Sequence, residues 1–420
     1  MAKPKSNEFR RIDHIKVRDD LYLRDGHDPV LVQRYSEDLE ALPPIEINQH
    51  DELIDGYHRV LAHQTIGVEQ IPVTVTETHS DLDISSRATL ANSKHGWPLT
   101  SSERKDAAIF LHADGTGRTK RQIAELLSVS ERTIRNYLVE PEKRLREKRN
   151  QRILDLHLEC YTQQEIADRL GISQQSVASS IKSFTEKGSA SDFDRDPDFK
   201  PKLYDVWNFG KLSNKVKHPG NSEQRILEEL IYRHTQPYGI VVDPFAGGGS
   251  TLDVCRKRLR RCYLSDRKPI PARADQIRRI DVLESLPKLG KRWADVSLTY
   301  MDPPYWKQIE GQYSEDDEDL ANMTLENFTT SLAAVIKNIG KKQSKGVVAL
   351  LIRPTQWKSK GRRVVDHAFD LISAVGDDLK YERRISCPTK GVMATPPMIE
   401  WAKENKELLA ITREVIIWRV

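Results

Sequence analysis

The chain has little of what a disulfide framework, a zinc site or a membrane span requires. It contains only four cysteines, Cys160, Cys255, Cys262 and Cys387, and they form no Cys-x-x-Cys pair. His-Glu-x-x-His is also absent from the sequence, so neither structural zinc nor a set of disulfides is expected. No apolar run approaches the roughly 18 residues of a transmembrane helix, and the first residues lack the apolar core of a signal peptide. These absences predict a cytoplasmic protein with no metal site and no membrane partner.

A strong net charge of either sign is missing as well. The formal net charge of the 420 residues is +4, from 66 basic and 62 acidic side chains. Any surface that binds nucleic acid must therefore be local. A chain of this length has room for two or three domains, each with its own buried core.

Two short motifs stand about sixty residues apart in the second half of the chain. The first, Asp243-Pro244-Phe245-Ala246-Gly247-Gly248-Gly249-Ser250, follows the apolar run 240–242. It predicts a strand, a glycine turn and a helix N-terminus, where the backbone can approach a ligand closely. The second, Asp302-Pro303-Pro304-Tyr305, ends the apolar run 296–301. Because open α/β sheets bind ligands at the carboxyl ends of their strands, both motifs are expected to open into one crevice.

The residue types of the second motif suit chemistry on an exocyclic amino group. The nitrogen of such a group is a poor nucleophile because its lone pair is delocalised into the ring. The Asp302 carboxylate and a proline carbonyl can each accept a hydrogen bond from one N–H of the amino group. Two prolines also remove competing backbone donors. Tyr305 offers a flat face to a base that has left the duplex. Taken alone, the motif is also compatible with a proline-rich turn that closes a buried strand.

With these motifs in this order, residues 208–420 resemble the amino-group DNA methyltransferases, which use S-adenosylmethionine to form N6-methyladenine or N4-methylcytosine. His218-Pro219-Gly220 and the apolar stretch 226–231 belong to the resemblance, as the segment that closes over the donor in this family. It implies a Rossmann-like, doubly wound α/β domain over residues 201–420. It also implies the catalytic residues Asp302, Pro303, Pro304 and Tyr305, and a donor site made by His218, Asp243, Pro244, Phe245, Gly247, Gly249, Ser250, Asp266 and Asp281.

Further strands are expected around the two motifs. Residues 261–266 end in Asp266, which is placed to bond ribose hydroxyls, and residues 280–283 would end a third strand with Asp281 beside the adenine of the donor. Either aspartate could instead be a helix N-cap or a turn residue. With strands over 346–352 and 413–418, strands and helices alternate from residue 239 to 420, as a doubly wound sheet requires.

Residues 99–187 carry two helix-turn-helix patterns, with ordinary helical hairpins as the alternative. Residues 122–135 have apolar side chains at helical spacing around a break near Ser128, and residues 165–177 repeat the pattern 43 residues later, with Gly171 in the turn. The basic run 143–152 between them suits phosphate contact or a solvated helix face. The second helix of such a unit presents its first side chains to base edges. Glutamine suits adenine and arginine suits guanine. The candidate DNA-binding residues are Arg132, Thr133, Arg135, Gln174, Gln175 and Ser176.

The first hundred residues resemble the N-terminal domain of partition protein B, through residues 53–62 and 67–75. The resemblance implies a small α+β domain over residues 8–98. In that family a strand, a glycine turn and an arginine-bearing helix form an anion or nucleotide pocket, which here would contain Gly56, His58 and Arg59. Arg59 lies in the first turn of the expected helix, whose N-terminus favours anions. The partition proteins carry Glu-Arg-Arg where this chain has Tyr57-His58-Arg59, and His58 could be an ordinary surface histidine.

The sequence thus predicts an N-terminal half that reads double-stranded DNA and a linker, residues 188–200, that joins it to a methyltransferase. Asp302 in place of serine before the prolines favours adenine N6 over cytosine N4. The alternative is a partition-like or transcriptional regulator with an inactive methyltransferase fold. RNA is disfavoured, since its deep, narrow major groove does not admit such helices. The sequence leaves open whether the chain forms a homodimer and whether a restriction nuclease accompanies it.

Overall fold

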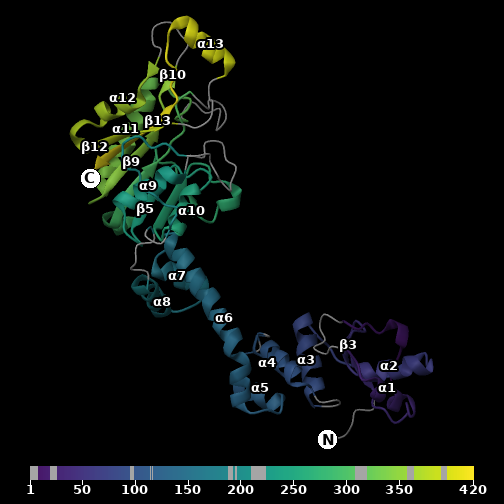
Figure 1. Cartoon of the computed structure of the whole chain (residues 1–420). Coiled ribbons are helices and arrows are strands. Elements are labelled where there is room, and N and C mark those ends of the chain that lie inside the picture. The colour runs from purple at the N-terminus through teal and green to yellow at the C-terminus, as the bar shows by residue number, and fades with distance from the viewer. Residues whose placement is uncertain are drawn as a thin grey trace. The chain divides into compact units, whose positions relative to one another are not determined.

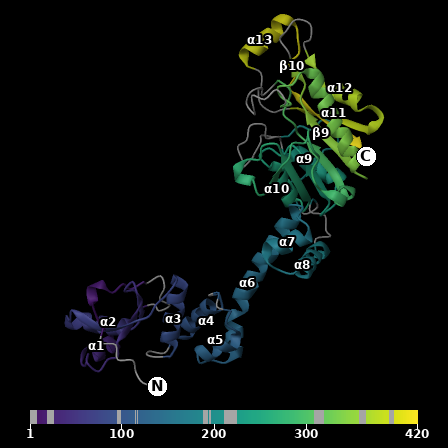
Figure 2. The same ribbon diagram turned by 180° about the vertical axis from the view of Figure 1, so that it is seen from behind.

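The computed structural model describes residues 8–18, 26–94, 99–113, 115, 117–187, 193, 196–209, 224–307, 319–356, 364–388 and 395–420 (Figures 1 and 2). The chain forms two compact units, Met1–Lys148 and Arg149–Val420. The division falls inside one helix, α6 (Glu131–Leu158). It therefore passes between the two helix-turn-helix patterns, whereas the sequence analysis placed both in one domain. No helix in the described ranges combines the length and apolar character needed to cross a bilayer.

The first unit begins with a small α+β fold. Its four-stranded sheet has the order β1-β4-β2-β3, with a parallel β2–β4 pair between antiparallel neighbours. Isoleucine, leucine and valine side chains from the strands and from α2 form its core. The elements are β1 (Glu8–Arg11), α1 (Pro29–Ser36), β2 (Ile45–Ile47), β3 (Leu53–Asp55), α2 (Tyr57–Ile66), β4 (Gln70–Val75) and α3 (Asp81–Lys94).

The two helix-turn-helix units have the same caps. In the first, α4 (Ser101–Ala113) packs against α5 (Lys120–Leu126) and the start of α6, and Ser128 adopts a φ of 51° in the turn. In the second, α7 (Gln163–Leu170) and α8 (Gln174–Lys187) pack on the end of α6, and Gly171 adopts a φ of 62°. Thr119 and Thr162 each close a capping box at the start of the first helix. Both units are therefore formed where the sequence predicted them, and they share α6.

Residues 196–200 of the predicted linker and Phe193 are described, and they pack on the second unit. Phe193 is buried, with the Arg258 guanidinium 4.3 Å from its ring centroid. A carboxylate oxygen of Asp196 lies 2.8 Å from Nη2 of Arg258, which is itself buried and also paired with Glu228. A buried guanidinium needs such partners, because an unpaired buried charge is strongly destabilising. These residues are thus part of the folded unit and do not act as a free linker.

The second unit is built on a seven-stranded sheet of order β12-β13-β9-β8-β5-β6-β7. The five strands from β9 to β7 are parallel, and β13 runs antiparallel to both β9 and β12. The strands are β5 (Ile240–Asp243), β6 (Arg261–Asp266), β7 (Ile277–Arg279), β8 (Val296–Met301), β9 (Val347–Ile352), β12 (Lys380–Pro388) and β13 (Thr412–Arg419), with a separate pair β10 (Thr355–Gln356) and β11 (Val364–Val365).

Helices cover both faces of this sheet. Val241 and Ala349 face one side and pack with α9 (Gln224–His234) and α10 (Ser250–Lys257). Val242 and Leu350 face the other side and pack with α11 (Leu325–Lys342) and α12 (His367–Val375), the green helices of Figure 1. A further helix among the described residues of this unit is α13 (Pro396–Asn405). This is the doubly wound arrangement predicted for the C-terminal half.

One predicted strand differs in position. β7 ends at Arg279, so residues 280–283 follow the strand and do not end it. Asp281 accepts a hydrogen bond from the Leu283 backbone N–H at 3.0 Å, which forms an Asx turn. Turn formation by an aspartate was the alternative open at this position, and it explains why the strand stops short.

Candidate active site

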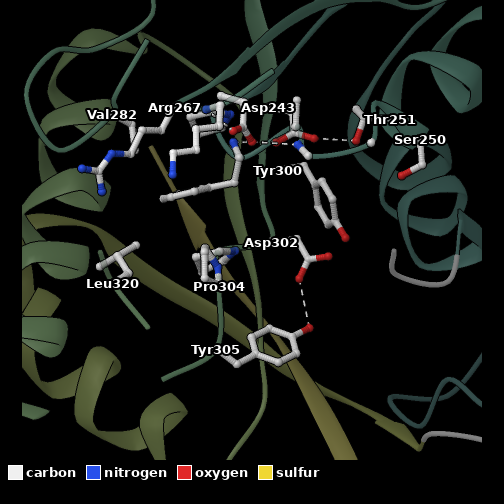
Figure 3. Close-up of a pocket in the computed structure, with 18 of the residues that line it drawn as sticks. Asp243, Ser250, Thr251, Arg267, Val282, Tyr300, Asp302, Pro304, Tyr305 and Leu320 are labelled. Carbon is white, nitrogen blue, oxygen red and sulfur yellow. Dashed lines mark hydrogen bonds between the residues drawn. The ribbon is translucent and has the colours of Figure 1, made fainter. Parts of the chain in front are cut away.

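The two motifs lie at the carboxyl ends of neighbouring parallel strands. β5 pairs with β8 on one side and with β6 on the other, so the chain order reverses direction across the sheet between β5 and β8. Such a switch point is where open α/β sheets bind ligands. One pocket opens there, and Figure 3 shows Asp243, Thr251, Asp302 and Tyr305 around it.

The glycine loop is held by carboxylates at two strand ends. Asp243 accepts hydrogen bonds from the Phe245 N–H at 2.9 Å and from the Thr251 hydroxyl at 2.6 Å. The Gly247 N–H donates to Asp266 at 2.8 Å. Gly249 adopts a φ of 74° as the N-cap of α10, a conformation that favours glycine. The loop therefore turns directly into a helix N-terminus, as the sequence predicted.

Asp243 is fully buried beneath this loop. Burial raises the pKa of its carboxyl group to about 7, although the Thr251 hydroxyl and the Phe245 N–H act to lower it; nearby Asp302 raises it further. The folded protein therefore holds a proton on Asp243 at a pH where the unfolded chain would release it.

This raised pKa predicts a pH dependence of stability. The contribution of Asp243 is fully present below about pH 4 and is lost as the pH rises through about 7. Asparagine does not titrate, so Asp243→Asn should not lose this contribution. Between about pH 4 and about pH 7 the free energy of unfolding of the unsubstituted protein should therefore fall relative to that of the variant, by about 1.4 kcal/mol per pH unit. Denaturant unfolding at about pH 5 and about pH 8, followed by fluorescence of the buried tryptophans of this unit, measures the difference. A difference that does not change with pH would contradict the assignment.

Two further carboxylates line the same pocket. Asp266, at the end of β6, also accepts from the Lys268 N–H at 2.8 Å, so it fixes the backbone on both sides of the pocket rim. Asp281 forms an ion pair with Arg267 at 3.2 Å. A carboxylate offers about four acceptor positions, so both groups keep capacity for a ligand's hydroxyl or amino groups.

The second motif leaves β8 with its carboxylate at the pocket. The Tyr305 hydroxyl donates to Asp302 at 3.0 Å, which Figure 3 marks with a dashed line. Pro303 and Pro304 also line the pocket and contribute carbonyl groups without N–H groups. Asp302 is thus oriented by its neighbour, and the backbone around it presents acceptors.

Arg413 on β13 is a residue that the sequence analysis missed. Burial acts to lower the pKa of its guanidinium, but Tyr305 and Asp302 raise it above its ordinary value, and Tyr305 is also a hydrogen-bond partner. Arg413 therefore places positive charge beside Asp302 and Tyr305. Its sequence signal is weak, because Glu414 and Arg419 of the same strand are charged as well.

The structure brings most of the predicted donor and catalytic residues into one pocket. Gly249 does not line it and instead shapes the turn, and His218 lies outside the described residues. Several residues that were not predicted also line the pocket: Gln224, Leu227, Gly248, Thr251, Val254, Arg267, Lys268, Val282, Leu283, Tyr300, Asp319 and Leu320. Thr251 could have been predicted, because it is a polar residue directly after the glycine motif.

The predicted DNA-contacting residues lie at the starts of α6 and α8. Arg132, Gln174 and Gln175 are exposed there. Arg135 is exposed and forms an ion pair with Glu131 at 2.6 Å. Thr133 and Ser176 are bonded through their hydroxyls to the serines that precede each helix, so they act in capping. Three of these six residues lie in the compact unit Met1–Lys148, and the other three lie in Arg149–Val420.

In the predicted anion pocket of the first unit, Arg59 and His58 already have partners within the protein. Gly56 has a φ of 109°, and a Cβ there would lie 2.8 Å from the guanidinium of Arg59. Arg59 forms an ion pair with Asp55 at 2.8 Å, while its buried Nε has no hydrogen-bond partner among the described residues. His58 accepts from the backbone N–H of Asp28 at 2.9 Å, so it connects α2 to the start of α1.

Part of the chain matches a known family. Residues 129–270 match the sequence model of the N6/N4 methyltransferase family, described as DNA methylase, and this supports the predicted resemblance from residue 208 to residue 270. The matched range includes the glycine loop and ends before Asp302.

Parts of the chain are similar to other proteins. The transcriptional regulator NovG of Streptomyces niveus is 31% identical over 113 residues, 27% of this chain and 35% of NovG, so the chain spans about a third of that relative. ParB of Caulobacter crescentus, complexed to the centromeric parS site, is 16% identical with a TM-score of 0.27, over 42% of this chain and 100% of that chain. A Burkholderia thailandensis 1,6-didemethyltoxoflavin-N1-methyltransferase, with bound S-adenosylhomocysteine, is 11% identical with a TM-score of 0.27, over 44% of this chain and 71% of that chain.

Proposed function

We propose that this chain is a DNA methyltransferase that transfers a methyl group from S-adenosylmethionine to the exocyclic amino group of a flipped base, with adenine N6 favoured over cytosine N4. One observation carries the proposal. The glycine loop after β5 and Asp302-Pro303-Pro304-Tyr305 after β8 line the same pocket, at the switch point of the sheet. The family match over residues 129–270 supports the same reaction class.

The residues of the pocket fit the proposed donor. Asp266 and Asp281 supply carboxylates for ribose hydroxyls and for an adenine amino group, and Val282 and Leu283 supply an apolar wall. The glycine loop and the N-terminus of α10 provide close backbone approach. When bound, the donor would supply an electrophilic methyl group.

The catalytic motif prepares the acceptor. In the proposed mechanism Asp302 and a proline carbonyl each accept a hydrogen bond from one N–H of the amino group. These hydrogen bonds draw the nitrogen toward a tetrahedral shape, which frees its lone pair. Tyr305 orients Asp302 through the 3.0 Å hydrogen bond. Pre-positioned groups of this kind are worth about 10²–10³ in rate each.

A regulator with an inactive methyltransferase fold is the competing function, and NovG is named as a transcriptional regulator. The catalytic motif argues for activity, because Tyr305 orients its aspartate and Arg413 places positive charge near both side chains. An inactive domain has no physical need for that arrangement. The deciding experiment incubates the protein with unmethylated duplex DNA and S-adenosylmethionine, then identifies the modified base by mass spectrometry and its context by modification-sensitive sequencing. No modified base on any DNA would leave the regulator as the better description.

The exposed side chains at the starts of α6 and α8 predict where sequence preference resides. We expect Gln174→Ala with Gln175→Ala, or Arg132→Ala with Arg135→Ala, to relax or shift the preferred site by about 1–3 kcal/mol for each lost base contact. Binding to a panel of duplexes measures the effect. Gln33→Ala, an exposed glutamine in α1 outside both helix-turn-helix units, is the control. Unchanged preference in both double variants would place recognition elsewhere.

A further inference from the structure

The second helix-turn-helix is fixed to the edge of the catalytic sheet, and a basic groove lies along the junction. We infer that this groove is a binding site for the phosphodiester backbone of DNA, which carries the duplex from α8 to the active-site pocket. The inference rests on the proposed function. It adds a contact surface that neither the glycine loop nor the catalytic motif supplies.

Charged and aromatic contacts hold the two sides of the groove together. The Tyr161 hydroxyl, in the turn before α7, donates to the Asp275 carbonyl at 3.1 Å. The Arg278 guanidinium of β7 lies 5.0 Å from the Tyr161 ring centroid, and its Nη2 donates to the Glu159 carbonyl at 3.0 Å. Buried Glu159 also pairs with Arg256 of α10. The helix-turn-helix is thus anchored by its polar groups, and its position relative to β7 is defined.

The groove is strongly basic. Arg169, Lys268, Arg278 and Arg279 line it, against one acidic lining residue, Asp275. Arg169 is exposed and stacks at 4.2 Å from the Tyr161 ring centroid, which restricts its side chain while leaving its N–H groups available to solvent. Arg279 is exposed and forms no ion pair with any described residue. A guanidinium presents a rigid fork of donors that matches phosphate oxygens, so this set suits an anionic backbone.

The position of the groove favours DNA as the occupant. Arg169 lies in the last turn of α7, the first helix of its unit, and the first helix of a helix-turn-helix crosses the DNA backbone while the second enters the major groove. The groove shares Lys268 with the active-site pocket. A duplex read by Gln174 and Gln175 would therefore lay its backbone across Arg169 and Arg279 and continue toward Asp302.

The salt dependence of DNA binding tests this inference in the full-length chain. Each phosphate contact contributes about 0.9 to the slope of log affinity against log salt for duplex DNA. We expect Arg169→Ala with Arg279→Ala to lower the slope by about 2, so that the unsubstituted protein loses about tenfold more affinity than the variant when salt rises fourfold. Lys380→Ala with Arg383→Ala removes the same charge from β12, at the opposite edge of the sheet, and should leave the slope unchanged.

The outcomes separate this inference from the proposed function, because the slope is measured without donor or methyl transfer. Equal slopes for the unsubstituted protein and the groove variant would overturn the inference even if the enzyme methylates DNA. An equal decrease of the slope in the β12 control would also overturn the inference, since the slope would then depend on the total charge of the protein. The groove variant should weaken binding by the same factor for every duplex sequence. A loss confined to one sequence would make Arg169 and Arg279 base-reading residues and would also contradict the inference.

Discussion

Asp302→Ala is expected to reduce methyl transfer by about 10³-fold while donor affinity changes little. Asp302 lies at the carboxyl end of β8 and is proposed to accept a hydrogen bond from an N–H of the amino group. Loss of one pre-positioned acceptor or proton-handling group typically costs about 10²–10⁴ in rate. The proposed donor residues are on other elements: the loop after β5, the end of β6 and the turn after β7. Transfer of a labelled methyl group to DNA and calorimetry of donor binding measure the two quantities separately.

Two substitutions sharpen this test. Asp302→Asn keeps the shape of the side chain, so a comparable loss of rate would identify the charge as the critical property. Asp295→Ala, an exposed aspartate that precedes β8 at its amino end, should leave the rate unchanged. Loss of donor binding together with activity in Asp302→Ala would mean that Asp302 belongs to the donor site, and the proposed mechanism would be wrong.

Asp266→Ala is expected to weaken donor binding by about 100-fold. The carboxylate holds the Gly247 and Lys268 N–H groups at 2.8 Å each and is proposed to bond the ribose as well. Hydrogen bonds to a charged group contribute about 1.5–3 kcal/mol each, and two loosened loops would lose the shape of the pocket. Calorimetric titration with S-adenosylmethionine gives the affinity.

Asp281→Ala provides the comparison within the same pocket. Asp281 holds one backbone N–H and is paired with Arg267, so it supports less of the pocket wall and its loss should weaken binding less. The unfolding midpoint of each variant controls for general destabilisation. Unchanged donor affinity in Asp266→Ala would remove the case for this donor site.

The sequence was informative wherever a buried strand ends in a motif. The runs before Asp243 and Asp302 are apolar because parallel central strands are buried on both faces, so both strands and their ends could be predicted. β7 was misplaced because it has only three residues and an Asx turn at Asp281 follows it. Short strands of this kind carry almost no periodicity.

Contacts between distant segments could not be predicted. Arg413 meets Tyr305 only because β13 enters the sheet antiparallel beside β9, and a single charged residue in a strand does not reveal its partner. Phe193 and Asp196 were placed in a linker because the segment around them is polar, yet Arg258 binds both side chains. The junction of Tyr161 with Arg278 likewise joins residues more than a hundred positions apart.

The anchoring of Tyr161 and Glu159 to the sheet edge has a consequence for where the proposed methyltransferase would act along DNA. A reading helix on a flexible tether would allow the modified base to lie at a variable separation from the recognised bases. Here α8 and Asp302 belong to one compact unit, and α7, which precedes α8, is anchored through Tyr161 to β7. If α8 reads DNA as proposed, the interval between the base pairs that it contacts and the base that receives the methyl group should therefore be constant in base pairs, on one side of the contacted sequence only. The proposed methyltransferase would then modify DNA at a constant offset and with a fixed polarity.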